Sequence, residues 1–278
     1  MVKGMAHLTY LIPEEVRQQT PQKVQPMEKE KFNPQNYDSM RAAWMNAEEG
    51  ALHKLDGIQC DKCRNKGVIY YFDGDYFMNR QCECMKQRLV KRHMMESGLG
   101  MLLERCTFDS YRTDEPWQKI VKDIALKYAA EQHAMWLLVS GQPGSGKTHI
   151  CTAVCNHLIQ NGNQVSYKIW GDLFRELDAN AYHYEVRQRI MEDIRNTEIL
   201  YIDDFLKNYK AYPKMAAIAF DVINARYNAR KPLILSTEYT LDEIESMDAA
   251  LAGRIDEMSY HAKIKIKEAK ERNMRTRR

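Results

Sequence analysis

From about residue 98 onward, short apolar runs alternate with longer amphipathic segments, as expected for strands separated by helices. Strand-length runs occupy residues 136–140, 164–170, 199–202, 233–236 and 259–266. The segments between them have helical length and cover 115–132, 148–160, 172–196 in one or two pieces, and 213–228 with Pro213 as the first helical residue. Five strands joined by helical crossovers predict an α/β fold with a mainly parallel, doubly wound sheet.

The preceding residues lack this alternation. Residues 1–36 hold four of the eight prolines, which predicts an irregular arm. A helix is predicted over 37–55 and a basic linker helix over 85–97, on either side of a cysteine-rich segment. The expected division is an N-terminal arm and helix (1–56), a cysteine module with its linker (57–97) and the α/β domain (98–278).

A glycine-rich motif follows the first strand of the α/β pattern. Residues 141–148 read G-Q-P-G-S-G-K-T and match the phosphate loop G-x-x-x-x-G-K-S/T in its required place between a strand and a helix. Backbone N–H groups and the helix dipole would hold phosphates, Lys147 would reach the β- and γ-phosphates of ATP, and Thr148 would offer its hydroxyl to Mg²⁺. The predicted nucleotide-binding set is Gly141, Gln142, Pro143, Gly144, Ser145, Gly146, Lys147, Thr148 and His149.

Two adjacent carboxylates end the third apolar run. Asp203 and Asp204 directly follow residues 199–202. At this distance and order after a phosphate loop, we expect Asp203 to hold Mg²⁺ and Asp204 to orient or activate the attacking water. The alternative is that both residues only cap a turn. Cys151 and Cys155, four residues apart on the helix after the loop, are expected to pack in the core.

Four cysteines flank a predicted β-hairpin. Eighteen residues separate the pair Cys60 and Cys63 from the pair Cys82 and Cys84, and Asp73-Gly74 marks a turn between two apolar runs. The turn would bring both pairs together, where four thiolates suit a closed tetrahedral Zn²⁺ site. Such a metal would supply much of the folding energy of so short a segment. The alternatives are free buried cysteines, or His93 in place of one ligand.

Charge is unevenly distributed, although the net charge is only +3. Residues 263–278 carry a net charge of +6, which suits phosphate contacts but equally suits a solvated end. Seven cysteines, an odd number, do not indicate a disulfide framework, and no apolar run approaches the length of a membrane span. We therefore expect a cytoplasmic protein with no membrane partner.

In their order along the chain, these motifs resemble the DnaC/DnaI family of bacterial replicative-helicase loaders, which are AAA+ ATPases related to DnaA and to the IstB transposition helpers. The resemblance covers roughly residues 57–266 and is carried by the cysteine module, the phosphate loop and segments 102–108, 201–205, 223–227, 233–237 and 253–258. It implies a three-layer P-loop AAA+ domain behind a zinc ribbon. The implied activity is ATP-dependent loading of a replicative DNA helicase onto single-stranded DNA by a homo-oligomer that forms with ATP, and the arm and zinc module would grip the helicase.

Further residue roles rest on this resemblance alone. Arg254 would be an arginine finger that reaches the nucleotide of a neighbouring subunit, or else a surface arginine paired with Asp256 or Glu257. Glu238 lies at or near the sensor position after the fourth strand, where the family usually has asparagine. Arg272 is either a second sensor or a free tail residue, because the helical lid of fuller AAA+ proteins is expected to be missing.

Single-stranded DNA would be bound by the helices after the second strand. The candidates there are Lys168, Phe174 and Arg175, and Phe174 could equally be a core residue. Three other functions remain open from the sequence: an IstB-like transposition helper that binds duplex DNA, a small-molecule P-loop phosphotransferase, and a module that only binds ATP.

Overall fold

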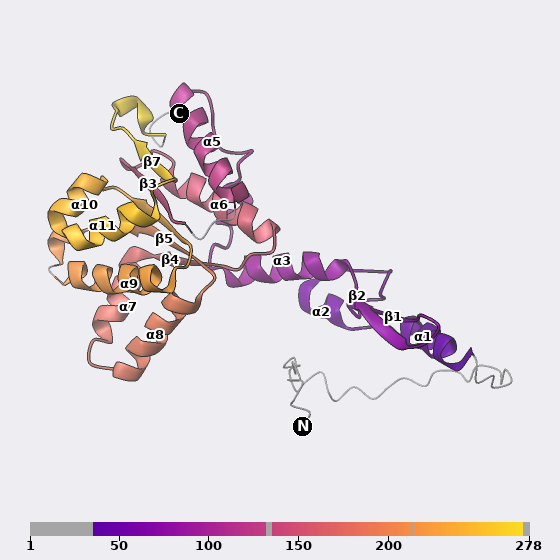
Figure 1. The fold of residues 1–278 in the computed structure, drawn as a ribbon. Helices are drawn as coiled ribbons and strands as arrows, with labels where there is room; N and C mark the ends of the chain where they lie inside the picture. The colour runs from indigo at the N-terminus through magenta and orange to yellow at the C-terminus, as the bar shows by residue number, and fades with distance from the viewer. Residues whose placement is uncertain (1–35, 132–134, 213, 275–278) are drawn as a thin grey trace. The chain divides into compact units, whose positions relative to one another are not determined.

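The computed structural model describes residues 36–131, 135–212 and 214–274, which fall into two compact units (Figure 1). One unit contains α1 (Tyr37–Ala47) and residues 70–78 of a hairpin. The other contains residues 48–69 and the described residues from 79 onward. The predicted arm lies mostly outside the described residues, and the boundaries predicted at residues 57 and 98 stay predictions.

The larger unit is built on a five-stranded sheet whose pairings are all parallel. Its spatial order is β4-β5-β6-β3-β7, and the strands are β3 (Leu137–Gly141), β4 (Val165–Ile169), β5 (Ile199–Phe205), β6 (Leu233–Thr237) and β7 (Lys263–Ile266). The five predicted strands are confirmed, although β5 continues to residue 205 and β7 begins only at residue 263. Parallel strands place the carboxyl ends of β3, β5 and β6 at one edge, where ligands of such sheets bind.

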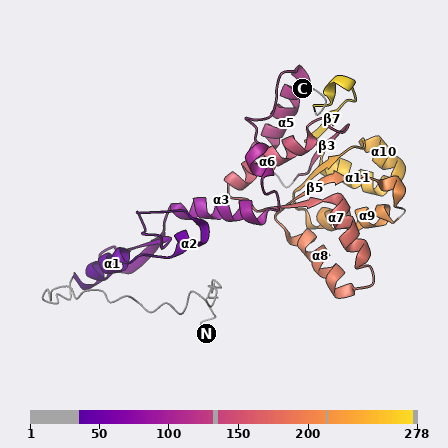
Figure 2. The same ribbon diagram turned by 180° about the vertical axis from the view of Figure 1, so that it is seen from behind.

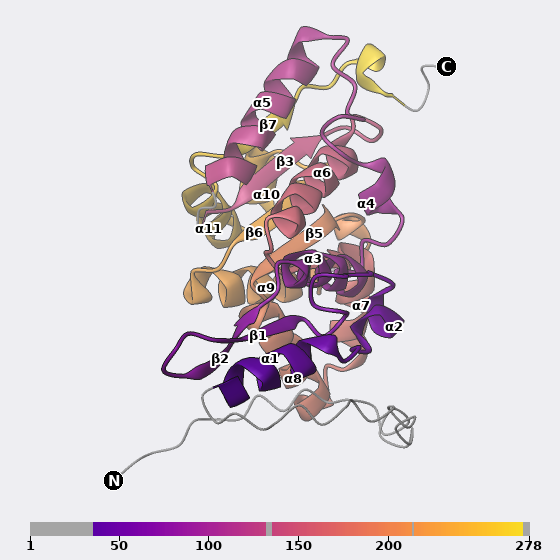
Figure 3. The ribbon, with the colours of Figure 1, turned by 90° about the vertical axis from the view of Figure 1, so that its right-hand side faces the viewer.

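Helices cover both faces of this sheet, so the predicted three-layer architecture is confirmed (Figures 1 and 3). Alternate strand residues point to opposite faces: Leu137 and Val139 pack with α5 and α6, whereas Leu138 packs with α7, α9 and α11. Figure 2 shows the same layers from behind. The helices of this part are α4 (Leu102–Arg105), α5 (Pro116–Glu131), α6 (Lys147–Gln160), α7 (Trp170–Ala179), α8 (Tyr184–Asn196), α9 (Met215–Ala229), α10 (Leu241–Met247) and α11 (Ala249–Met258).

Two local predictions need correction. The helix predicted from residue 172 already begins at Trp170 as α7, and the fully buried Trp170 ring packs against Phe205 and fixes the start of the helix. The predicted helix over 37–55 is two helices, α1 and α2 (Leu52–Asp56). The chain leaves the helical path because the Gly50 amide donates to the Arg64 carbonyl at 2.7 Å. Pro213 lies outside the described residues.

The hairpin consists of β1 (Val68–Phe72) and β2 (Phe77–Gln81), and the linker helix is α3 (Cys84–Glu96). In the smaller unit, the Arg41 guanidinium lies 4.4 Å from the centre of the Phe77 ring, and the Asn46 side chain bonds to the backbone of Tyr70. At the turn, the Asp73 carboxylate accepts hydrogen bonds from two backbone amides, which explains the turn predicted there. No helix among the described residues is both long and apolar enough to cross a membrane.

Candidate nucleotide and metal sites

The phosphate loop connects the end of β3 to the start of α6. Gly144 and Gly146 have φ values of +78° and +88°, a left-handed conformation that favours glycine, and this lets the backbone curl around a central space. The Lys147 ammonium lies inside the loop and donates to the carbonyl oxygens of Gly141 at 2.7 Å and Gln142 at 3.0 Å. Burial lowers the pKa of Lys147, and Glu238, followed by Asp204 and Asp203, opposes that shift. Glu238 is therefore close enough to act electrostatically on the loop lysine.

Asp203 is the point where the loop helix and three strands meet. Its Oδ1 accepts the Thr148 hydroxyl at 3.2 Å and also accepts the Ser236 hydroxyl from β6. Its Oδ2 accepts the Tyr167 hydroxyl from β4 at 3.2 Å. A hydroxyl and a carboxylate oxygen side by side are ligands that suit Mg²⁺ next to a nucleotide. The structure therefore brings together Lys147, Thr148 and Asp203, as the sequence predicted.

Asp204 lies in a break of the β5–β6 register between residues 202 and 205. Its φ of +55° is in the left-handed region, which is uncommon for an aspartate and is found more often at functional sites. The Lys207 amine bonds to Asp204 Oδ2 at 2.6 Å and lies 3.7 Å from Glu238. The Asp204 amide donates to Asp203 Oδ1, but its carboxylate pairs with Lys207 and takes no part in the side-chain bonds of Asp203, so the two carboxylates have different surroundings and can have different roles.

Segments distant in sequence complete the walls of the loop. Gln142 exchanges two hydrogen bonds with the backbone of Ala269, and the Met274 amide donates to the Gly144 carbonyl at 2.8 Å. The described part of the basic C-terminal segment therefore packs on the phosphate loop. Arg272 is not a free tail residue, because its guanidinium lies 5.3 Å from the centre of the Trp117 ring.

His149 is held beside the loop. Its Nε2 lies 3.2 Å from both the Thr107 carbonyl and the Ser110 hydroxyl, and its ring meets the Tyr111 ring edge-on. Burial lowers the pKa of His149, although the contact with Thr107 partly opposes this. These contacts assign His149 to the wall of the site, and a direct bond to nucleotide stays a prediction.

Arg254 lies on α11 and packs against α9 of the same chain. Its guanidinium donates to the Asn224 side chain at 3.0 Å and to the Ala250 carbonyl at 2.9 Å, and it covers the Phe220 ring. The alternative ion pairs with Asp256 and Glu257 are wrong, because Asp256 pairs with Lys263 and Glu257 with Arg230. The finger role therefore stays a prediction about a second subunit.

The three candidate DNA contacts have different surroundings. Phe174 is 4% exposed and packs between Trp170 and Tyr212, so it belongs to the core and is removed from the DNA candidates. Arg175 is exposed on α7 and pairs with Asp172, while Lys168 is half-buried on β4. Phe174 is buried because it lies on the inner, apolar face of the amphipathic helix α7.

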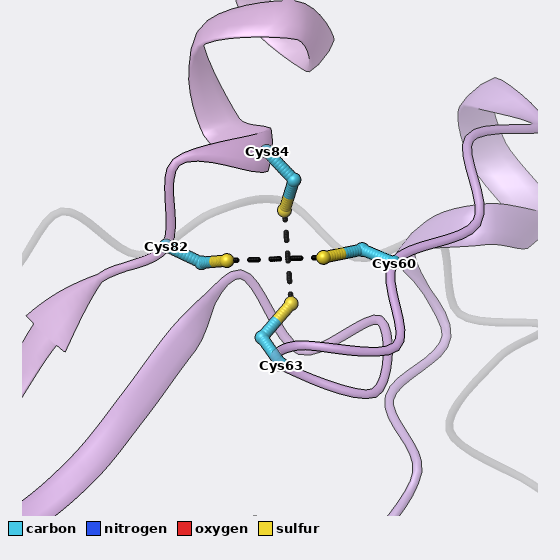
Figure 4. A group of neighbouring side chains, drawn as sticks. All are labelled: Cys60, Cys63, Cys82 and Cys84. Atoms are coloured by element: carbon cyan, nitrogen blue, oxygen red, sulfur yellow. Dashed lines mark hydrogen bonds between the residues drawn. The ribbon is translucent and has the colours of Figure 1, made fainter.

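The four predicted cysteines converge on one point (Figure 4). The Sγ atoms of Cys60 and Cys82 are 3.8 Å apart and those of Cys63 and Cys84 are 3.6 Å apart. A tetrahedral zinc site with Zn–S bonds of about 2.3 Å places its sulfurs roughly 3.8 Å apart, so these residues fit the ion. His93 is not part of the cluster, because its Nδ1 lies 3.0 Å from the Asn163 carbonyl.

Within the cluster, the surroundings favour thiolate at Cys63 but not at Cys82 or Cys84. Burial raises the pKa of Cys84 to about 12, whereas the pKa of Cys63 falls to about 7 despite its burial, because the Gly67 amide donates to its sulfur at 3.3 Å and the neighbouring thiols contribute. The buried Arg88 side chain bonds to Asp56 at 2.5 Å and supports the helix that begins at Cys84. Cys151 and Cys155 are fully buried in the main core, as predicted.

Sequence analysis missed Tyr167 and Ser236 as partners of Asp203. Both lie in predicted strands, and the neighbouring strand pairs are what bring them to the carboxylate. The only available signal was the alternation along residues 164–170, which places Tyr167 on the same face as Val165. The pattern of the sequence does not give the order of the strands, and that order is needed to place Tyr167 and Ser236 beside Asp203.

Comparison with known proteins agrees with this geometry. The chain is 33% identical over 195 residues to the uncharacterized protein YqaM of Bacillus subtilis, covering 65% of this chain and 61% of that protein, which is less than two thirds of its length. It is 28% identical to the phage-like element PBSX protein XkdC of the same organism, covering 80% of this chain and 88% of that protein. The replicative helicase loader DnaC of Escherichia coli is 24% identical over 174 residues, covering 61% of this chain and 69% of DnaC.

The solved structure of DnaI has a TM-score of 0.50 at 17% identity, covering 64% of this chain and 98% of that structure. This likeness concerns the fold alone, and it agrees with the expected three-layer α/β class. The expected resemblance to the DnaC type is also confirmed as a distant one. The sequence model of the IstB-like ATP binding proteins matches residues 65–278, which include the phosphate loop and the carboxylate strand. The chain belongs to this family of IstB-like ATP-binding proteins.

Proposed function

We propose that this chain is an ATPase that loads a replicative DNA helicase onto single-stranded DNA. The observation that carries the ATPase part is the 3.2 Å contact between the Thr148 hydroxyl and the Asp203 carboxylate at the mouth of the phosphate loop. When Mg²⁺ is bound, it neutralises charge on the phosphates of ATP. Thr148 and Asp203 would hold that ion, and the curled loop with Lys147 would hold the phosphates.

Each of the remaining charged residues would have a separate role in ATP hydrolysis. Lys147 would exchange its two loop carbonyls for phosphate oxygens, because its donors are already inside the loop. Asp204 would orient the attacking water from its separate position in the β5 bulge, and Glu238 would sense the nucleotide through its proximity to Lys147 and Lys207. Arg254 of one subunit would stabilise phosphoryl charge in the next, which makes hydrolysis depend on oligomer formation.

The loader part is supported by the distant likeness to DnaC and by the four-cysteine cluster. The zinc-bound module would provide a compact surface for the helicase. DNA binding is supported by Arg175 and by the exposed rings of Tyr182 and Tyr184 after α7, which are 96% and 76% exposed. Exposed aromatic rings near positive charge are suited to stacking on single-stranded bases.

The test is a pull-down from host lysate with ATP, comparing wild type with Cys60→Ser. Cys106→Ser is the matched control, since Cys106 lies outside the cluster. We expect wild type and Cys106→Ser to retain a hexameric helicase and Cys60→Ser to lose it. Retention of no helicase by the wild-type chain would contradict the loader role. Recovery of a transposase would instead support the second candidate, an IstB-like transposition helper, to which the match with the model of the IstB-like ATP binding proteins points.

A hydrolysis assay tests the ATPase part separately. We expect Asp204→Asn to bind ATP but to lose turnover by about 100-fold or more, because the water would lack its orienting carboxylate. Asp172→Asn on the exposed surface of α7 is the control and should remain active. A wild-type chain that binds ATP without turnover, with DNA and at high protein concentration, would indicate a binding-only module.

A further inference from the structure

The hydroxyl of Tyr167 reaches Asp203 from the edge strand β4. Tyr167 pairs in register with Tyr201, so its side chain extends diagonally across two residues to place its hydroxyl 3.2 Å from Asp203 Oδ2. The other oxygen, Oδ1, accepts from Thr148, Ser236 and the Asp204 amide. Within the described part of the chain, Tyr167 is the only donor to Oδ2. Together with the three donors to Oδ1, it fixes the rotation of this carboxylate about its own axis.

The backbone of Tyr167 is held by a different part of the chain. Because β4 is an edge strand, its outer amides have no neighbouring strand in the sheet. The Tyr167 amide instead donates to the Ser97 carbonyl at 2.7 Å. A side chain at Gly98, whose φ is +80°, would meet the Tyr167 carbonyl oxygen at 3.3 Å, so the fit is close. One residue thus bonds Asp203 through its side chain and Ser97 through its backbone.

Ser97 directly follows α3, the helix that begins at the cluster cysteine Cys84. The Ser97 side chain is buried and bonds to the Met94 carbonyl and the Leu99 amide, which fixes the end of the helix. A helix of 13 residues is about 20 Å long. The four-cysteine cluster and Tyr167 are therefore attached to opposite ends of the same helix.

We propose that Tyr167 is the positioning residue for Asp203, and that it couples the placement of α3 and its cysteine cluster to Mg²⁺-dependent nucleotide binding. The inference rests on the proposed ATP site and extends it by a route from the cysteine module. A shift of α3 moves the Ser97 carbonyl, and β4 follows through the Tyr167 amide. The Tyr167 hydroxyl then turns the Asp203 carboxylate.

Tyr167→Phe tests the first step by removing only the hydroxyl. Tyr201→Phe is the matched control, because Tyr201 is the paired tyrosine on β5 and its buried hydroxyl, although it lies near Asp203, makes no hydrogen bond to the described residues. The dissociation constant of a fluorescent, non-hydrolysable ATP analogue is measured for each protein with and without added Mg²⁺. We expect the Mg²⁺-dependent gain in affinity to be smaller for Tyr167→Phe than for wild type, by a factor of up to about ten. This is the factor expected for the loss of a charge-assisted hydrogen bond. Its affinity without Mg²⁺ should match wild type.

The outcomes separate the two proposals. Full retention of the Mg²⁺-dependent gain by Tyr167→Phe overturns this inference and leaves the proposed ATP site intact. Equal losses in Tyr167→Phe and Tyr201→Phe would also overturn it, since they would indicate general damage to the strand pair. If the wild-type chain binds the analogue equally well with and without Mg²⁺, the assigned role of Asp203 fails, and the inference fails with it.

A double-mutant cycle tests the second step, the coupling through α3. Cys60→Ser perturbs the cluster, and the same binding measurement is made for Cys60→Ser, Tyr167→Phe and the double variant. We expect Cys60→Ser to reduce the Mg²⁺-dependent gain in the wild-type background and to have no further effect in the Tyr167→Phe background. Independent, additive losses, or no loss from Cys60→Ser, would overturn the coupling. Fluorescence of Trp136 and Trp170, both fully buried, confirms that the α/β core is folded in each variant.

Discussion

Arg226 on α9 is a fully buried arginine that holds the ends of three elements together. Its guanidinium donates to carbonyl oxygens at the end of α8, at the start of β5 and before β6. These partners are Ile194 at 3.0 Å, Arg195 at 3.5 Å, Thr197 at 2.6 Å, Glu198 at 3.1 Å and Pro232. The last carbonyls of a helix have no partner within the helix, so Arg226 supplies one. We predict that Arg226→Met strongly destabilises the larger unit.

The magnitude follows from the partners that the substitution would leave behind. Each of these bonds contributes roughly 1 kcal/mol net, and a buried carbonyl left without a donor costs about 1–3 kcal/mol. Against this, burial lowers the pKa of Arg226 to about 10, which shows that keeping the guanidinium charged inside the protein has its own cost. Methionine fills most of the volume and removes that cost. We therefore expect a net loss of about 3–5 kcal/mol, which is a large part of the ~5–15 kcal/mol stability of a typical domain.

Urea denaturation followed by tryptophan fluorescence measures this loss, because Trp136 and Trp170 are both fully buried in the larger unit. Arg189→Met is the matched control, since Arg189 is exposed on α8, and it should change the free energy of unfolding by less than about 0.5 kcal/mol. A loss below about 1 kcal/mol for Arg226→Met would contradict this prediction. It would mean that the five carbonyls find water or other donors when the guanidinium is absent.

The remaining predictions concern the loop and its walls. Lys147→Ala should abolish the rise in melting temperature that ATP gives to wild type, because the phosphates lose their cation, and a preserved rise would contradict the assignment. Gln142→Ala removes both bonds to Ala269, so hydrogen exchange of the Ala269 amide should accelerate by at least about tenfold; unchanged exchange would show that the C-terminal segment is held by other contacts. Since burial lowers the pKa of His149, the folded state favours the neutral ring, and the stability this contributes is present above about pH 6.5 and is lost as the pH falls below that value. His149→Gln should therefore lessen the drop in melting temperature between pH 7 and pH 5. An unchanged drop would show that protonation of His149 does not cause the loss of stability at low pH.

Elements with a strong local signal were predictable. The five strands, the linker helix and the hairpin turn are set by apolar runs, basic amphipathic spacing and the Asp73-Gly74 pair, all of which act within a few residues. The convergence of the four cysteines was also predictable, because a tight turn returns one pair to the other. The phosphate loop was predictable because its residues are contiguous and its backbone conformation requires glycine at fixed positions.

Contacts between distant segments were not predictable in this way. Nothing near Gly50 indicates that its amide bonds to Arg64, yet that contact divides the predicted helix. Phe174 could be read as exposed or buried, and only the packing of α7 against β5 decides in favour of burial. Arg226 lies in a segment that carried the family resemblance, but its role depends on carbonyls from three other elements. Long-range hydrogen bonds of this kind leave no periodic trace in the sequence.

The strand order gives Asp203 a particular place in the molecule. It ends β5, whose two neighbours β4 and β6 supply Tyr167 and Ser236, whereas the phosphate loop follows β3, one strand further away. A displacement of the edge strand therefore reaches the carboxylate through one strand pair, and it reaches the loop either through the bond between Asp203 and Thr148 or through three strand pairs. Because the Lys147 ammonium is anchored to loop carbonyls and not to β4, such a displacement should alter the Mg²⁺-dependent step before it alters the binding of phosphate. Under the proposed coupling, an event at the cysteine module would change the Mg²⁺-dependent step while ATP stays bound.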